Sequence, residues 1–552
     1  MAQRTKGRRK TGAVAQLLAA ADRARPLDLP GAVLAWGKAL ELQPGNPRAL
    51  TGLRALGFDE RRQVLDACRA LVNAGATPHA LALSGILARA NPADPQIAAF
   101  ETRALVITKA TDAALARIRP FLDSHPDLAA IRVAAGIAMA FSGDHAAAVA
   151  QLLPLSDDPA LDAEAINVLG TSLAFLGRLD DSGEVLMTAA RAGRLSVAGL
   201  YNLTRQTDMS GETAIARTLQ QVLDDPAAPR ADREMAAFGL AKVQEDRGDT
   251  AMAFRYLAQG NGLKPEADVI RFMDAARSAA TRARDTVARL AAGEPVTAPG
   301  PRPVFIVGMP RSGSTLVEQI LLGHSRVASL GESTRLSEAL RRMEAYTGPP
   351  DPVRLRDAYF EALPPEAAAA EVVLDKMPAN ALIAGVALAA LPEARVIHCR
   401  RHPMASGFSA FRLRFFEGYD YSARFSTIAA FHRLTEAQMS CWRGLFPERV
   451  RPVLYEALTE APERWIGDLV SFCGLEPQPG LADFRGSTQT VRTASLRQVR
   501  RGIYRGSSEA WKAYAEPLLP LMAELIEEIA HYEVELDAEL AQEDGTRRAG
   551  AA

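Results

Sequence analysis

Residues 308–315 combine two glycines with one arginine and three hydroxyl side chains, in the order Gly308-Met309-Pro310-Arg311-Ser312-Gly313-Ser314-Thr315. A short apolar run, residues 303–307, precedes this segment, and a helical pattern, residues 316–322, follows it. A strand that passes through such a turn into a helix directs backbone N–H groups and the positive end of the helix dipole towards one point. The segment therefore predicts a phosphate-binding loop.

The loop lacks the lysine that is typical of proteins that bind nucleoside triphosphates. In their pattern, G-x-x-x-x-G-K-[ST], the lysine reaches the terminal phosphates. Gly308 and Gly313 occupy the two glycine positions here, and Ser314 stands where the lysine is expected. This difference argues against ATP or GTP chemistry, so a nucleotide kinase is a disfavoured hypothesis.

A second anion site is predicted further along the chain. Arg401 follows the strand-like residues 395–399, and Ser409 lies within the next helical segment. Arginine grips phosphate oxygens through its planar fork, and a serine hydroxyl adds one short hydrogen bond. Alone, this spacing also fits a surface arginine and an unrelated helical serine. Combined with the first loop, it indicates a ligand with two anionic groups.

Together, the two motifs resemble those of the sulfotransferase family, whose members use 3′-phosphoadenosine 5′-phosphosulfate as co-substrate. The resemblance covers roughly residues 302–515 and points to the tyrosylprotein sulfotransferase branch and its bacterial repeat-fused relatives. It implies that the 3′-phosphate is held by Arg401 and Ser409, and the 5′-phosphosulfate by Arg311, Ser312, Gly313, Ser314 and Thr315.

Further segments resemble the same branch. Residues 330–335 look like its Gly-Glu-x-Thr-Arg segment, which implies Glu332 as the catalytic base, and residues 375–378 are similar to its Lys-x-Pro element, which contains Lys376. Residues 495–499 resemble its Ser-x-x-Gln-Val segment, which begins at Ser495, and Tyr455 falls on a Tyr-Glu element near the nucleotide.

The sequence also departs from that branch. Gly502 stands where proline is usual, and Ala510 precedes Trp511 where a lysine is usual. The segment that covers the nucleotide is therefore expected to differ. A nearby arginine could replace the missing charge, the candidates being Arg500, Arg501 and Arg505.

Transfer of a sulfuryl group to a hydroxyl explains why these residue types occur together. Negative charge spreads over the sulfuryl oxygens and the leaving phosphate, and fixed cations such as Arg311 and Lys376 lower the barrier. Ser495 is expected to donate a hydrogen bond to the same oxygens. Glu332 as general base would contribute on the order of 10²- to 10⁴-fold. Its alternative role, a carboxylate at a helix N-terminus, is also physically sound.

The first half of the chain is rich in alanine and leucine and repeats itself. Turn residues recur every 34 residues, at Gly75, Lys109, Gly143, Gly177 and Gly211. This spacing resembles a tetratricopeptide-repeat array of about six to seven helix pairs. Such arrays bind extended peptides in a concave groove; the alternative is a scaffold or dimer surface.

We therefore predict an all-α tetratricopeptide-repeat solenoid followed by an α/β P-loop-like sulfotransferase domain with a parallel sheet. The expected boundaries are a basic disordered tail at 1–12, the helical array at 13–290 and a Pro/Gly-rich linker at 291–302. The sulfotransferase domain is expected at 303–537 and a second disordered tail at 538–552.

Composition limits the partners. Lys and Arg number 64 against 65 Asp and Glu, so the balance indicates no nucleic-acid partner and no membrane surface. The 4 cysteines are scattered without a C-x-x-C pair, which fits a reducing compartment and suggests no metal site. No segment has the length of a membrane span or the pattern of a signal peptide, and we expect a cytoplasmic protein.

The favoured hypothesis is transfer of sulfate, without a metal ion, to a tyrosine of a protein or peptide presented by the repeat groove. The first alternative keeps the donor and changes the acceptor to a carbohydrate or a small molecule. The second alternative is a repeat scaffold that binds the nucleotide without catalysis. The sequence does not identify the acceptor, and it does not decide whether the protein forms a homodimer.

Overall fold

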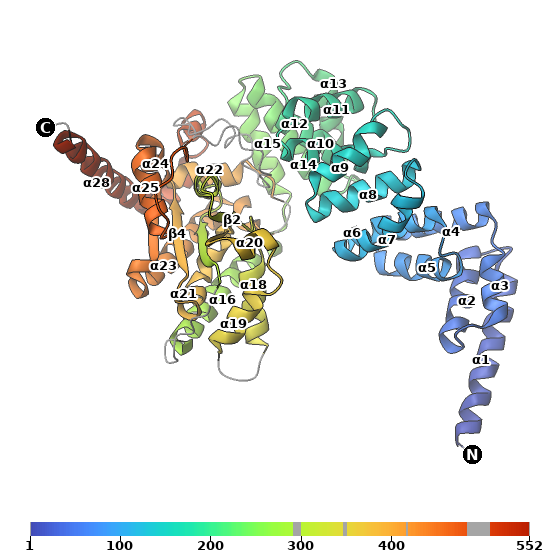
Figure 1. Cartoon of the computed structure of the whole chain (residues 1–552). Coiled ribbons are helices and arrows are strands. Elements are labelled where there is room, and N and C mark those ends of the chain that lie inside the picture. Colours follow the sequence, from blue (N-terminus) through green and yellow to red (C-terminus); the bar gives the residue numbers. More distant parts are fainter. Residues whose placement is uncertain (1, 291–299, 346–349, 416–417, 483–507, 551–552) are drawn as a thin grey trace. The chain divides into compact units, whose positions relative to one another are not determined.

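The computed structural model describes residues 2–290, 300–345, 350–415, 418–482 and 508–550 (Figure 1). The chain divides into two compact units, Met1–Gln206 and Thr207–Ala552. We refer to them as unit 1 and unit 2 and describe each by itself. Within the described ranges, none of the helices combines the length and the apolar character that crossing a membrane requires.

Unit 1 is helical, as the sequence predicts. Its helices, with one short 3-10 turn, are α1 (Ala2–Ala24), α2 (Leu29–Leu42), α3 (Pro47–Arg54), α4 (Phe58–Asn73), α5 (Thr77–Ala90), α6 (Pro95–Ile107), α7 (Thr111–Ser124), α8 (Ala129–Ser142), α9 (His145–Leu152), η1 (Leu153–Leu155), α10 (Ala163–Phe175), α11 (Leu179–Arg191) and α12 (Val197–Gln206).

The turns between successive helices lie where the 34-residue spacing places them. Gly75, Lys109, Gly143 and Gly177 each separate two helices, and all four have a positive φ between 62° and 92°. Glycine adopts this conformation without steric cost, whereas a lysine pays for it. The common backbone geometry explains why three of these four positions are glycine.

Close contacts inside the helix pairs repeat at the same interval. A methyl group added at Gly136 would lie 2.5 Å from the side chain of Leu152, and one added at Gly170 would lie 2.6 Å from Leu186. The second pair is the first shifted by 34 residues. The two helix pairs therefore pack in the same way, with a leucine side chain filling the space next to a glycine.

Unit 2 begins with four helices, α13 (Thr213–Asp224), α14 (Arg230–Asp246), α15 (Thr250–Gly262) and α16 (Glu266–Leu290). A sheet of five parallel strands follows, in the order β2-β3-β1-β4-β5. The predicted α/β domain with a parallel sheet is confirmed. The strands are β1 (Arg302–Gly308), β2 (Val327–Ser329), β3 (Val372–Asp375), β4 (Arg395–Arg400) and β5 (Val450–Leu454).

Helices and short 3-10 turns connect and follow these strands. They are α17 (Ser314–Leu322), α18 (Arg335–Glu344), α19 (Pro352–Phe360), α20 (Pro365–Ala369), η2 (Pro378–Leu382), α21 (Ala384–Ala390), α22 (Pro403–Phe411), η3 (Asp420–Ala423), α23 (Phe425–Leu445), η4 (Pro447–Arg449), α24 (Tyr455–Glu460), α25 (Pro462–Phe472), η6 (Ala510–Tyr514), α27 (Leu519–Glu524) and α28 (Ile526–Gly550).

The central strand β1 is buried on both faces. Val304 and Ile306 belong to a core that also contains Leu316 of α17 and Leu469 of α25. Phe305 points to the opposite face, where its ring lies 5.5 Å from that of Tyr359. A run of apolar residues without alternation is typical of a parallel strand covered by helices on both sides. The phosphate-binding loop therefore extends from the middle of a rigid sheet.

The last helices of the helical half are joined to the α/β domain by polar contacts. Asn261 of α15 donates its side-chain amide to the carbonyl of Phe411 at 2.8 Å, and Lys264 forms a 2.7 Å ion pair with Asp420. The sequence predicts a linker at residues 291–302. The compact unit that contains the sheet starts earlier, at Thr207.

Both ends of the described chain are helical. Helix α1 begins at Ala2 and helix α28 continues to Gly550. These helices include residues 2–12 and 538–550, within the two segments for which the sequence predicts disorder.

Candidate functional site

Two glycines give the loop after β1 its shape. Gly308 has φ 142°, and a methyl group added to it would lie 2.2 Å from the backbone carbonyl oxygen of Cys399 on β4. Gly313 has φ 97°, and its methyl group would lie 2.4 Å from the ring of Tyr455. Because even a methyl side chain would clash at both positions, the loop requires glycine at each.

The two predicted anion sites meet in the structure. Arg311 donates from Nε to the hydroxyl of Ser409 on α22 at 3.0 Å. Arg401, directly after β4, donates from Nη1 to the backbone carbonyl of Arg311 at 3.1 Å. Arg311 itself has a positive φ of 73°, which a non-glycine residue adopts only at a cost. The glycine loop and the arginine–serine pair thus form one continuous site.

Arg401 is a buried cation that lies beside the ring of Tyr455. Only 7% of the residue is exposed, its guanidinium lies 4.9 Å from the ring centre of Tyr455, and its Nε donates to Ser508 at 3.1 Å. In the described part of the chain, no carboxylate lies within ion-pair distance of it. Burial lowers the pKa of the Arg401 guanidinium, against the opposing effect of Tyr455 and Glu456. A bound anion would supply the missing charge.

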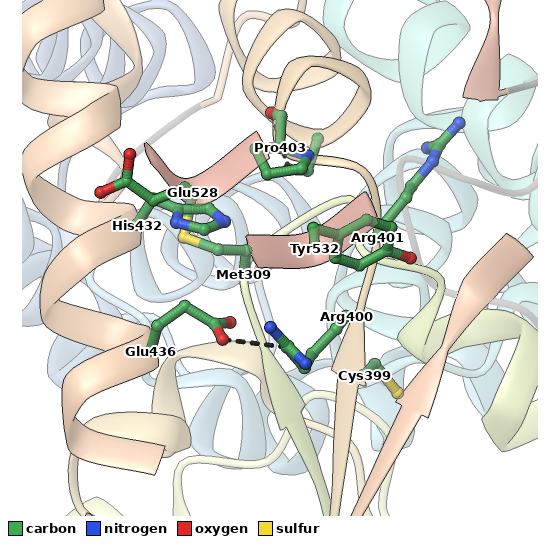
Figure 2. Close-up of a pocket in the computed structure, with 10 residues that line it drawn as sticks. Met309, Cys399, Arg400, Arg401, Pro403, His432, Glu436, Glu528 and Tyr532 are labelled. Atoms are coloured by element: carbon green, nitrogen blue, oxygen red, sulfur yellow. Dashed lines mark hydrogen bonds and ion pairs between the residues drawn. The ribbon is translucent and has the colours of Figure 1, made fainter. Parts of the chain in front are cut away.

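The neighbouring arginine has a different partner. Figure 2 shows Arg400 directed towards Glu436, with which it forms a 2.9 Å ion pair, while Arg401 points away from that carboxylate. Successive strand residues face opposite sides of a sheet, which explains the divergence at the end of β4. The small cavity of Figure 2 is lined by both arginines and also by His432 and Glu528. Arg400 is therefore neutralised inside the protein, in contrast to Arg401.

The predicted base and the predicted lysine are in direct contact. The ammonium of Lys376 lies 2.5 Å from Oε1 of Glu332. The Lys376 side chain is 1% exposed, whereas that of Glu332 is 39% exposed. The backbone N–H of Lys376 donates to the carbonyl of Gly331 at 3.0 Å, and Gly331 has φ 63°. The turn before α18 thus presents a carboxylate to solvent while a buried cation holds it from behind.

The remaining predicted residues are distributed as follows. Ser314 and Thr315 are buried in the first turn of α17. The hydroxyl of Ser312 is buried and has no hydrogen-bond partner among the described residues, which is a costly state that a ligand oxygen would relieve. Ser495 lies outside the described residues, as do Gly502 and the three arginines proposed to replace the missing lysine. The roles of all these residues stay predictions.

Some residues around the site were not assigned a role from the sequence. Glu318 on α17 and Asp375 at the end of β3 are buried carboxyl groups close to Lys376. Ser508 bonds to Arg401 from a segment far away in sequence. The sequence could have indicated these two residues, because each is an acidic residue next to the apolar residues of α17 or β3. No sequence pattern singles out Ser508.

Aromatic side chains approach the base from the segment before α23. Burial, together with the charge of Glu332, raises the pKa of Tyr419 to about 12. The ring of Tyr419 stacks on Phe415 at 4.5 Å and lies 6.5 Å from that of Tyr421. Tyr421 is fully buried, and its hydroxyl has no partner among the described residues. Phe415, Tyr419 and Tyr421 thus form an aromatic cluster, in which Tyr419 feels the charge of Glu332.

In the described ranges, no group of three His, Cys, Asp or Glu residues is arranged to hold a metal ion. The charged groups gathered around the loop are instead Arg311, Arg401, Lys376 and Glu332.

Comparisons with known proteins find a family match within the α/β domain. The model of the sulfotransferase family matches residues 303–479, which form a sulfotransferase-family domain. The chain is also similar to an uncharacterized protein of Aquifex aeolicus (strain VF5), with 30% identity over 387 residues. This alignment covers 64% of the chain and 49% of the relative, so the chain spans about half the length of the curated protein that it matches.

Solved structures with similarity to the chain include two sulfotransferases. The sulfotransferase domain of the Synechococcus PCC 7002 olefin synthase has 21% identity and a TM-score of 0.29, and the match covers 40% of this chain and 90% of that domain. A sulfotransferase from Alicyclobacillus acidocaldarius has 19% identity and a TM-score of 0.25, with 42% of this chain and 97% of that chain covered.

Proposed function

We propose that this chain is a sulfotransferase that moves the sulfuryl group of 3′-phosphoadenosine 5′-phosphosulfate to a hydroxyl acceptor. One observation carries the proposal: Arg401 is buried, has no ion-pair partner among the described residues, and joins the glycine loop at the carbonyl of Arg311. A doubly anionic nucleotide fits such a site. The sulfotransferase-family match over residues 303–479 supports the same reading.

The residues of the loop fit the donor. Residues 310–315 would hold the 5′-phosphosulfate at the start of α17, where the unpartnered hydroxyl of Ser312 is available for a hydrogen bond. Arg401 and Ser409 would hold the 3′-phosphate, with Tyr455 beneath the guanidinium. The lack of space at Gly308 and Gly313 suits a loop whose backbone approaches the ligand closely.

The proposed transfer is a single in-line displacement. The acceptor oxygen forms a bond to sulfur while the bond between sulfur and the 5′-phosphate oxygen breaks, and the electron pair leaves with the phosphate as adenosine 3′,5′-bisphosphate. The acceptor proton moves to Glu332. Arg311 and Lys376 supply positive charge to the sulfuryl oxygens and to the leaving phosphate. Glu332 is suited to this role because its carboxylate is partly exposed and is held in place by Lys376.

We favour a tyrosine of a protein or peptide as the acceptor, delivered by the helical half acting as a tetratricopeptide-repeat array. The recurring turns at Gly75, Lys109, Gly143 and Gly177 support the repeat interpretation. The aromatic residues Tyr419 and Phe415 beside the base suit a phenolic acceptor.

The test incubates purified protein with donor labelled in the sulfuryl group and with separate pools of tyrosine peptides, glycans and small phenols. We expect label in the peptide pool and its loss in Glu332→Ala, whose binding of adenosine 3′,5′-bisphosphate should persist in calorimetry. Label confined to glycans would remove the tyrosine proposal. Nucleotide binding without turnover in any pool would indicate the non-catalytic scaffold, and tight ATP binding without affinity for the bisphosphate would refute the proposed donor.

A further inference from the structure

A buried carboxylate, Glu318, lies close to Lys376, which also contacts the proposed base Glu332. Glu318 is the fifth residue of α17, and its side chain is 7% exposed. The neighbouring helix residues Val317 and Leu321 belong to the core of the sheet. A carboxylate in such a position is costly unless charges and hydrogen bonds compensate for it. The partners of Glu318 therefore indicate why it is there.

Those partners connect Glu318 to the turn that carries Glu332 in two ways. The hydroxyl of Ser329 donates to Oε1 of Glu318 at 2.7 Å and accepts the backbone N–H of Gly331 at 3.0 Å. The ammonium of Lys376 lies 3.8 Å from Oε2 of Glu318, and the Lys376 backbone donates to the carbonyl of Gly331. Both peptide groups of Gly331 are thus fixed by residues that contact Glu318.

Lys376 consequently lies between two carboxylates of unequal exposure. It is 2.5 Å from the partly exposed Glu332 and 3.8 Å from the buried Glu318. In the proposed transfer, Glu332 takes up a proton and ceases to balance the ammonium. Among the described residues, Glu318 is then the remaining carboxylate within ion-pair distance of Lys376, and the charge that develops on the leaving group also faces the ammonium. A buried counter-ion keeps the ammonium in place, and its burial separates it from the acceptor.

We infer that Glu318 is a positioning residue of the transfer site, which acts through Lys376 and through the Ser329–Gly331 turn. This inference rests on the proposed sulfuryl transfer and adds a residue to it. Glu318 is too deeply buried to contact the acceptor itself, so its effect should appear in turnover and not in donor binding.

The test compares Glu318→Gln with wild type in the full-length protein. Glutamine keeps the shape and an oxygen for the Ser329 hydroxyl but removes the charge. We expect kcat to fall about 10- to 100-fold, while the acceptor KM and the calorimetric affinity for adenosine 3′,5′-bisphosphate stay within about threefold. Glu371→Gln, which removes an exposed carboxylate at the start of β3, is the matched control and should leave kcat unchanged.

An unchanged kcat in Glu318→Gln would overturn the inference, and so would an equal loss of donor affinity, since that would indicate a general structural role. If Glu318→Gln does not fold, Ser329→Ala tests the same connection, because it removes the hydroxyl bridge and leaves the charge. We expect kcat to fall at least threefold in this variant, and an unchanged kcat would overturn the inference.

A readout independent of turnover separates this inference from the proposed function. In a crystal structure of Glu318→Gln, we expect the Lys376 ammonium to move away from its position between the two carboxylates, and an unmoved ammonium would overturn the inference. Absence of sulfuryl transfer in wild type would instead refute the proposed function, whatever the crystal structure shows.

Discussion

Asp375 provides a quantitative prediction, because its carboxyl group is fully buried at the end of β3. Burial raises its pKa from the usual 3.8 to about 7, although the hydrogen bond from Tyr359 and the charges of Arg335 and Lys376 oppose this rise. A carboxyl with a raised pKa in the folded state contributes most to stability below its unfolded pKa. That contribution is lost as the pH rises through about 7.

Replacing Asp375 by asparagine removes the group that must ionise. The side-chain oxygen of Asn can still accept the hydrogen bond that the Tyr359 hydroxyl donates at 3.1 Å. The difference between pKa values of 3.8 and about 7 corresponds to about 4 kcal/mol, at about 1.4 kcal/mol per pKa unit. Relative to wild type, the free energy of unfolding of Asp375→Asn should therefore rise by up to about 4 kcal/mol between about pH 4 and pH 9.

The assay is urea unfolding of both proteins across this pH range, followed by tryptophan fluorescence. Trp442, Trp465 and Trp511, three of the 4 tryptophans, lie in unit 2, so the signal mainly reports the unit that contains Asp375. Asp357→Asn, which removes an exposed carboxyl on α19, serves as control. A stability difference that stays constant with pH in Asp375→Asn would refute the reasoning.

Three further changes test the site and its support. Gly308→Ala places a methyl group 2.2 Å from the carbonyl oxygen of Cys399, so calorimetry should detect no donor binding; normal affinity would contradict the packing argument. Arg401→Lys loses the planar fork, and the dissociation constant for adenosine 3′,5′-bisphosphate should rise at least tenfold, about 1.4 kcal/mol, whereas an unchanged value would argue against this anion site. Asp420→Asn breaks the ion pair with Lys264, and steady-state kinetics should show a severalfold higher acceptor KM with unchanged donor affinity; a loss confined to donor binding would contradict the placement of this segment on the acceptor side.

The sequence predicted the loop of the site because its signals are local. The spacing of Gly308 and Gly313 after an apolar run reflects backbone conformations that only glycine adopts cheaply, and such constraints can be read without knowing the fold. Arg401 and Ser409 were predicted as an anion site from their residue types and their place after a strand and in a helix, and the family resemblance implied a role towards the 3′-phosphate. The structure places both against Arg311, although their roles stay predictions.

The support behind the site was not predictable in the same way. Glu318 reads as one polar residue in a helix, and its burial depends on strands that are distant in sequence. The contact between Lys376 and Glu332 requires that β3 and the turn after β2 lie side by side. The union of α15 with the α/β domain uses polar pairs such as Lys264–Asp420 and the contact of Phe254 with Phe411. Such single contacts leave no periodic trace in the sequence.

That union determines where the protein can be divided. Helices α13–α16 continue the helical half of the chain, yet they belong to the same compact unit as the sheet. Cutting at the proline-rich segment before β1 would strip Asn261 and Lys264 from their partners and uncover buried aromatic rings. A shortened protein should instead start at Thr207. Under the proposed function, exchanging the helices that precede this residue would change which acceptors are presented for transfer.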